Sequence, residues 1–239
     1  MMVWKLEKGS AKGVWIACAV IALWLLVMLA ALFTPVEYNL LLTLLYILLL
    51  THLYTGLFIT AHDAMHGAVS WNRKINLFFG RFCTTLFMFN SFEVLFPKHY
   101  DHHKFAGTEK DPDFHPPHPV MWYLKFLLEY VSFRQLLMAA ICFNVLRLWF
   151  PVPNLLLFWI LPSLLSTLQL FIFGTYLPHR GDHHLQNRHR ARSQRNNHLL
   201  AFITCYFFGY HYEHHDSPQT PWWLLYKMKE QQEQNKMIV

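Results

Sequence analysis

Two long stretches without a charged residue constrain the fold of this chain more than any other feature. Residues 14–33 form a run of 20 residues, and residues 38–61 a run of 24, without Asp, Glu, Lys or Arg. A helix rises about 1.5 Å per residue, so each run reaches at least about 30 Å, the thickness of the hydrocarbon core of a bilayer. Only residues 34–37 separate them, which leaves room for a tight connection alone. The sequence predicts a helical hairpin that crosses a membrane twice.

A second pair of apolar runs predicts a second hairpin. Residues 131–150 carry two arginines, both near the ends of the run, where long side chains reach the lipid headgroups. Residues 154–177 are uncharged, and the Pro-Val-Pro sequence at 151–153 favours a turn between the two runs. We therefore expect an all-α integral membrane protein with four transmembrane helices in two hairpins, folded as a single domain over residues 1–239.

Two further apolar stretches do not fit a simple crossing. Residues 75–97 are interrupted by Arg81 and Glu93, and charged side chains at the centre of a bilayer are costly. Residues 199–210 are too short, at 12 residues, to span a membrane. Both stretches are predicted to form re-entrant or interfacial helices.

The composition agrees with a membrane protein and singles out histidine. Hydrophobic residues make up 54% of the chain and charged residues 14%, against about 25% charged residues in soluble domains. The 16 histidines outnumber the 14 Asp and Glu residues, a ratio that surface solubility does not explain. The four cysteines form no C-x-x-C motif, which argues against an iron–sulfur cluster. We expect the lipid bilayer, and no nucleic acid, as a partner.

The distribution of Lys and Arg predicts the orientation. Three basic residues precede the first run, seven lie between residues 62 and 130, eight follow residue 177, and none lies at 34–37 or 151–153. Cytoplasmic loops carry the excess of Lys and Arg. The alternation therefore predicts four crossings with both termini on the cytoplasmic side.

Three histidine motifs lie on this predicted cytoplasmic side. They read H-x-x-x-H at 62–66 and H-x-x-H-H at both 99–103 and 211–215. A helix brings residues i, i+3 and i+4 onto one face, and neutral imidazole is a common metal ligand, so each motif is expected to direct its rings toward one point. A structural zinc takes four ligands and favours Cys, which makes two redox metals the better interpretation. The predicted ligands from these motifs are His62, His66, His99, His102, His103, His211, His214 and His215.

A ninth ligand is predicted at His179, where the last apolar run ends. His183 and His184 follow it, but their spacing is H-x-x-x-H-H, and they lie beyond Gly181 in an Arg-rich segment where positioning is looser. We expect His179 to be a ligand, His183 to lie just outside the ligand set or to face the substrate, and His184 to be dispensable.

The sequences around the motifs resemble the bacterial beta-carotene ketolase (4,4'-oxygenase) family, within the membrane fatty-acid hydroxylase and desaturase superfamily. The resemblance covers residues 14–226 and is carried by the three motifs with their flanks. These flanks include Asp111-Pro112-Asp113-Phe114, Tyr176-Leu177-Pro178-His179, Phe208-Gly209-Tyr210 before the third motif and Pro221-Trp222-Trp223 after it.

The resemblance implies an O2-dependent non-haem di-iron enzyme that places keto groups at C4 and C4' of beta-ionone rings, with the nine histidines as iron ligands. Asp63, Asp113 and Glu213 are expected to orient imidazoles. Electrons are expected from a ferredoxin-type donor with its reductase. The arginines of the predicted cytoplasmic face either dock this donor or only reflect the positive-inside distribution: Arg180, Arg188, Arg190, Arg192 and Arg195. The expected location is a bacterial inner membrane or a thylakoid membrane.

Two alternatives stay open at this point. A carotenoid 3-hydroxylase or a fatty-acyl desaturase or hydroxylase of the same superfamily carries the same motifs and differs in the shape of its substrate cavity. A membrane metal-binding or transport protein belongs to another class, and ionisable residues along a pathway at mid-bilayer are typical of it. Only His52 occupies such a position in the predicted crossings.

Overall fold

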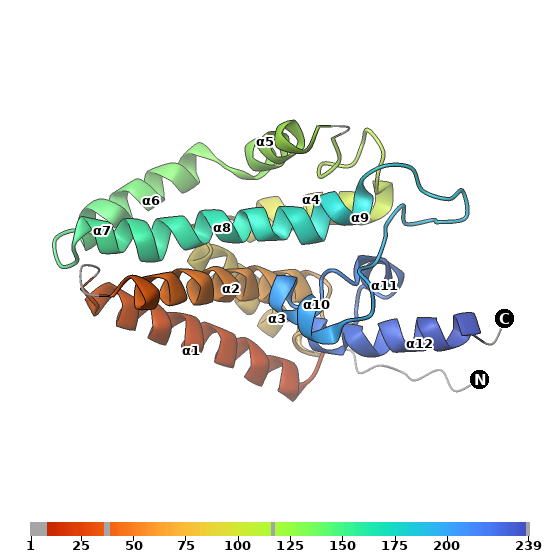
Figure 1. The fold of residues 1–239 in the computed structure, drawn as a ribbon, viewed down its shortest axis with the longest axis horizontal. Coiled ribbons are helices and arrows are strands. Elements are labelled where there is room, and N and C mark those ends of the chain that lie inside the picture. The colour runs from red at the N-terminus through yellow and green to blue at the C-terminus, as the bar shows by residue number, and fades with distance from the viewer. Residues whose placement is uncertain (1–8, 36–38, 116–117, 238–239) are drawn as a thin grey trace.

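The computed structural model describes residues 9–35, 39–115 and 118–237, and all regular structure within these ranges is helical. Helix α2 (Leu40–Met65) packs against α1 (Ala11–Phe33) on one side and against α8 (Leu161–Leu170) on the other. Helix α3 (Arg73–Leu86) also packs against α2. The end of α2 lies near α9 (Leu177–His179) and α11 (His211–Asp216) at one end of the bundle (Figure 1).

The first predicted hairpin consists of α1 (Ala11–Phe33) and α2 (Leu40–Met65), both long and apolar enough to cross a membrane. The side chains of Ser10 and Asn39 cap them by accepting hydrogen bonds from backbone amides of the first turn. Tyr38, where the second predicted crossing begins, lies outside the described residues. The helix continues past the predicted end at residue 61 and thereby carries the first histidine motif.

The last predicted crossing is one continuous helical segment, Val152–His179, of 28 residues. It comprises α7 (Val152–Leu155), α8 (Leu161–Leu170) and α9 (Leu177–His179), joined by π-helical turns at Leu156–Ile160 and Phe171–Tyr176. A π-helical turn inserts an extra residue and frequently marks a functional site. The second such turn ends three residues before His179.

The crossing expected at residues 131–150 is shorter than predicted, because the one helix within this segment has 14 residues. The structure has α5 (Pro119–Tyr130) and α6 (Phe133–Leu146), which meet at an angle of 82°. Val131 is extended, and the Ser132 side chain caps α6 by accepting from the amide of Gln135. The cap starts a new helix of 14 residues, so the described chain has three helices able to span, or four if the bent pair is one span.

The two apolar stretches that were not expected to cross form separate helices. Residues 75–97 are divided between α3 (Arg73–Leu86) and α4 (Phe92–Phe105), and the 199–210 stretch contains α10 (His198–Cys205). The chain then continues through α11 (His211–Asp216), a 3-10 turn (Trp222–Leu224) and α12 (Leu225–Met237).

Two left-handed turns precede the helices that carry the second and third histidine motifs. Met88 and Phe89 have φ of 56° and 58° before α4, and Tyr206 and Phe207 have φ of 48° and 63° before α11. Positive φ is costly for bulky side chains. Packing offsets the cost, because Tyr206 is buried and its ring meets Gly56 of α2 so closely that a methyl group there would clash with it.

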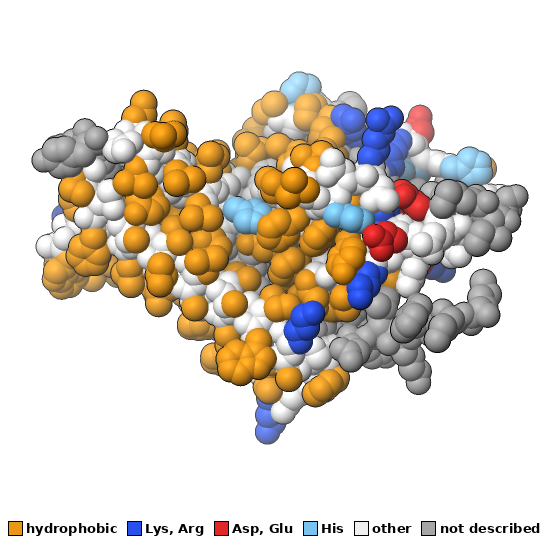
Figure 2. Space-filling model, turned by 60° about the horizontal axis from the view of Figure 1, so that its bottom comes forward, with side chains coloured by type: hydrophobic (Ala, Val, Ile, Leu, Met, Phe, Trp, Pro, Cys, Tyr) orange, Lys and Arg blue, Asp and Glu red, His pale blue; other side chains and the backbone are white. Residues whose placement is uncertain are grey.

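The surface of the helical bundle divides into an apolar part and a charged end. Hydrophobic side chains cover most of the face in Figure 2, and Lys, Arg, Asp and Glu gather near one end of it. Leu128 and Phe133, at the bend between α5 and α6, expose 80% and 81% of their surface. Such contiguous exposed apolar surface is what a lipid-facing protein presents.

One amide side chain stabilises the end of α1 that lies away from the histidines. Asn154 is buried in α7, and its Nδ2 group contacts the carbonyls of Ala31, Leu32 and Thr34 at 3.4, 3.0 and 2.8 Å. Asn154→Ala removes this donor from the carbonyls of Leu32 and Thr34, while Ala31 still accepts from the Thr34 amide. We expect the unfolding temperature in detergent to fall by ~3–10 °C. Asn144→Ala is the control, since exposed Asn144 bonds only within its own helix. Equal unfolding temperatures for both variants would contradict this role.

Candidate metal centre

The nine predicted histidines converge in two groups at one end of the bundle. Within each group the ligand nitrogens lie within 4.8 Å of one another. One group contains His62, His66, His99, His103 and His214, and the other contains His102, His179, His211 and His215. The structure therefore brings together every histidine that the sequence singled out as a ligand.

The second and third motifs are each shared between the two groups, contrary to the expectation that each motif serves one point. In α4, the i and i+4 residues His99 and His103 belong to the first group, and His102 belongs to the second. In α11 the pattern is reversed, with His211 and His215 in the second group and His214 in the first. Residues i and i+4 lie one above the other on a helix, so each pair reaches one group and the residue beside it reaches the other.

The ring nitrogens face one another at distances that fit a metal between them. The Nε2 atoms of His103 and His214 are 3.0 Å apart, those of His211 and His215 3.0 Å, and those of His102 and His215 3.2 Å. Metal–nitrogen bonds of about 2.0–2.1 Å at right angles put neighbouring nitrogens about 3 Å apart.

Two buried Nε2 atoms of the histidine groups have no hydrogen-bond partner among the described residues. These are the Nε2 atoms of His62 and His179, which belong to different groups. A buried polar atom without a partner costs free energy. A metal ion in each group would give these two atoms a partner. The donor set and its geometry identify a metal site.

Burial keeps most of these imidazoles neutral. It lowers the pKa of His99, His214 and His215 well below the usual value. Neutral imidazole is the form that binds a metal, because its unprotonated nitrogen supplies the lone pair.

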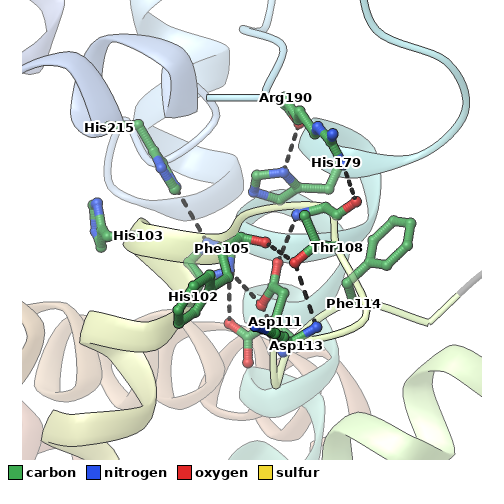
Figure 3. A network of polar contacts seen from close by, with 12 residues as sticks. His102, His103, Phe105, Thr108, Asp111, Asp113, Phe114, His179, Arg190 and His215 are labelled. Carbon is green, nitrogen blue, oxygen red and sulfur yellow. Dashed lines mark hydrogen bonds and ion pairs between the residues drawn. The ribbon is translucent and has the colours of Figure 1, made fainter. Parts of the chain in front are cut away.

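Hydrogen bonds on the far side of the rings fix the orientation of two histidines (Figure 3). His102 Nδ1 donates to Asp111 Oδ1 at 3.0 Å, and His179 Nδ1 donates to the carbonyl of Arg190 at 2.8 Å. Burial acts to lower the pKa of His102, but the Asp111 and Asp113 carboxylates outweigh it and raise that pKa. Each bond holds Nδ1 protonated and turns Nε2 toward the centre of its group.

Asp111 was not among the predicted site residues. Its carboxylate also accepts hydrogen bonds from the amides of Gly107 and Asp113, at 2.8 and 2.9 Å, and is buried. The Asp111-Pro112-Asp113 segment is the sequence feature that could have indicated it, but only Asp113 was predicted to orient an imidazole. Asp113 Oδ2 lies 3.6 Å from His102 Nδ1, farther than Asp111, and its Oδ1 accepts a hydrogen bond from the Tyr130 hydroxyl.

The other predicted orienting residues bond mainly to backbone and to other side chains. Asp63 lies 3.6 Å from His62 Nδ1 and accepts a hydrogen bond of 3.0 Å from the amide of Trp222. Glu213 accepts from the Ser193 hydroxyl and pairs with Lys229 at 3.3 Å. Through these contacts α2 and α11 are tied to segments that carry no histidine motif.

His183 and His184 lie outside both groups. His183 Nε2 donates to the carbonyl of His179 at 3.3 Å and is half-buried, whereas His184 is exposed and its Nδ1 accepts from the amide of Gln186. The structure thus separates both from the nine converging rings.

A cavity of about 180 Å³ reaches both histidine groups. His62 and His99 of the first group and His102 and His211 of the second line its inner end. Its other walls are mostly apolar and come from α2, α5, α6, α8 and the π-helical turn before His179. An apolar molecule in this cavity lies directly against the candidate metal centre.

Comparisons with known proteins agree with the site. The fatty acid desaturase family model matches residues 38–147 and 129–234. A beta-carotene ketolase from a Paracoccus species is 40% identical over 225 residues, covering 91% of this chain and 88% of the relative. A second Paracoccus beta-carotene ketolase is 42% identical over 184 residues, covering 74% of each chain. A zeaxanthin 4-ketolase from Chlamydomonas reinhardtii is 39% identical over 193 residues, or 76% of this chain and 43% of the relative. No solved structure matches the chain.

Proposed function

Because the chain belongs to the fatty acid desaturase family and, within it, to the beta-carotene ketolases, we propose that it converts the C4 methylene groups of beta-ionone rings into ketones. The proposed substrate is beta-carotene, which becomes echinenone and then canthaxanthin. Each oxygenation takes a C–H bond, O2, two electrons and two protons to a C–OH group and water. The second oxygenation gives a geminal diol, which loses water to leave the ketone.

The observation that carries this proposal is the contact between an apolar cavity and two groups of histidines. Nine imidazoles exceed the four ligands of a structural zinc site and match two redox metals. We assign the five-histidine group to one iron and the four-histidine group to the other. Bound iron supplies the activation of O2, which no amino-acid side chain provides.

The chain itself binds and orients the substrate. The apolar cavity walls take up the hydrocarbon ring and exclude water, while the histidine groups fix the end of the cavity where reaction occurs. Gly174 and Thr175 of the π-helical turn line the same cavity just before His179. A change in this turn therefore affects both the cavity wall and the position of a ligand.

The proposed orientation places both termini and the histidine groups on the cytoplasmic side of the membrane. The positive-inside distribution of Lys and Arg supports it, and so does the position of His62 and His179 at the ends of spanning helices. A bacterial inner membrane or a thylakoid membrane is the proposed location.

A ferredoxin-type donor is the proposed source of electrons. The segment after α9 extends from the histidine end of the bundle (Figure 1) and carries five exposed arginines, which suit an acidic partner: Arg180, Arg188, Arg190, Arg192 and Arg195. Arg190 also donates to the carbonyl of Gly107 at 2.9 Å, which ties this segment to the loop after α4.

Expression in cells that accumulate beta-carotene tests the function. We expect the monoketone and the diketone, identified by chromatography and mass spectrometry, and no ketone in cells that express the His211→Ala variant. Hydroxylated carotenoid alone, without ketone, would favour a 3-hydroxylase. Unchanged pigments with altered fatty-acid unsaturation would favour a fatty-acyl desaturase.

A further inference from the structure

Asp113 and Tyr130 form a polar pair on the wall of an otherwise mostly apolar cavity. Both residues line the cavity, and the Tyr130 hydroxyl donates a hydrogen bond to Asp113 Oδ1. The Asp113 side chain is 12% exposed, so its carboxylate is largely withdrawn from solvent yet open to the cavity. Burying a carboxylate beside a hydrocarbon substrate costs free energy. Its presence there indicates a role that an apolar wall cannot fill.

The carboxylate retains capacity to accept another hydrogen bond. Its Oδ1 is engaged by Tyr130, while Oδ2 lies 3.6 Å from His102 Nδ1, beyond hydrogen-bond length. His102 directs its Nδ1 proton to Asp111 at 3.0 Å instead. An ionised carboxylate has about four lone-pair sites, so Oδ2 can accept from a donor in the cavity.

Three other polar side chains of the cavity already take part in hydrogen bonds, whereas the Oε1 atom of Gln135 is buried without a partner among the described residues. The hydroxyls of Ser163 and Thr167 donate to carbonyls within their own helix, at 2.7 Å each. Asn90 accepts from the amide of Ser91. Asp113 combines an available acceptor with direct proximity to a candidate ligand, His102.

We propose that Asp113, oriented by Tyr130, holds the hydroxyl group of the C4 alcohol formed in the first oxygenation and so commits it to the second. This inference rests on the proposed function. The unreacted ring is a hydrocarbon and offers no donor, whereas the alcohol offers one O–H group to Asp113 Oδ2. The hydrogen bond keeps the alcohol beside the metal centre while a second O2, two electrons and two protons convert its remaining C4–H bond into the geminal diol and water. The two residues therefore set the ratio of ketone to alcohol among the products.

Two substitutions test the proposal in cells that accumulate beta-carotene. Asp113→Asn keeps the shape of the side chain but removes its charge, and Tyr130→Phe removes only the hydroxyl and retains the ring that lies 5.3 Å from Lys98 Nζ. The matched control is Tyr123→Phe, because Tyr123 lies on the same helix and contacts Thr167 at 3.2 Å without lining the cavity. The measured quantity is the ratio of 4-hydroxy to 4-keto carotenoid at equal total conversion, together with iron per purified chain.

We expect the alcohol-to-ketone ratio to rise about tenfold in Asp113→Asn, the factor that corresponds to a weakened charge-assisted hydrogen bond, and about threefold in Tyr130→Phe. Tyr123→Phe should keep the wild-type ratio. If Asp113→Asn forms no product, the alcohol-to-ketone ratio of Tyr130→Phe tests the inference. Wild-type ratios in the variants, with iron retained, overturn the inference but leave the proposed function intact. A wild-type chain that oxidises no carotenoid overturns the proposed function instead.

Discussion

Replacing His179 by alanine is expected to abolish ketone formation and to remove iron from the purified protein. His179 belongs to the group with only four imidazoles, and its buried Nε2 has no other partner among the described residues. Loss of a hydrogen-bond partner of a ligand typically costs 10–100-fold, so loss of the ligand itself should reduce activity by more than about 100-fold. Pigment analysis and iron content at matched expression measure both effects.

His184→Ala is the matched control for this substitution. His184 lies five positions after His179, in the arginine-rich segment that follows α9, but it is exposed and among the described residues bonds to the nearby backbone amide of Gln186. It should keep most of the activity and iron. A larger loss in His184→Ala than in His179→Ala would show that the ninth ligand is assigned to the wrong histidine.

Asp111→Asn is expected to lower ketone formation by about 10–100-fold. The substitution keeps the size of the side chain but removes the charge that stabilises the proton on His102 Nδ1. Burial acts to raise the pKa of Asp111, but His102 and the backbone amides outweigh it and hold that pKa below its usual value, so the carboxylate is ionised. Initial rates of ketone formation, normalised to the amount of protein, measure the effect.

Asp101→Asn is the control for Asp111→Asn. Asp101 is adjacent to His102 in α4 but exposed, so its substitution changes the same charge without touching the buried bond. Equal rates for the two variants would contradict the orienting role of Asp111.

The convergence of these histidines could be predicted because helical spacing is local. The offsets of three and four residues within each motif place the rings on one helix face, and the uncharged runs place the motifs at one end of the bundle. The sharing of α4 and α11 between the two groups could not be predicted. It depends on how these helices are rotated against α2 and α9, which only tertiary packing determines.

Asp111 and the bend between α5 and α6 show where local patterns fail. Asp111 lies nine positions after His102, and the loop that follows α4 brings it back to that ring. The path of the loop depends on side-chain contacts from α5, including the bond from Trp122 Nε1 to the carbonyl of Asp113 at 2.5 Å. Ser132 is a typical N-cap residue and indicates the start of a helix, but the apolar character of residues 131–150 favours the prediction of one continuous crossing. The left-handed turns at Met88 and Tyr206 lack the glycine that usually marks such backbone.

Metal analysis of the purified, full-length protein tests the central claim most directly. Each of the two groups of histidines could hold a metal ion, and the proposed chemistry assigns iron to both. We predict close to two irons per chain, with little zinc, in protein purified from iron-replete cells that convert beta-carotene. One zinc per chain and no iron in active protein would contradict the account.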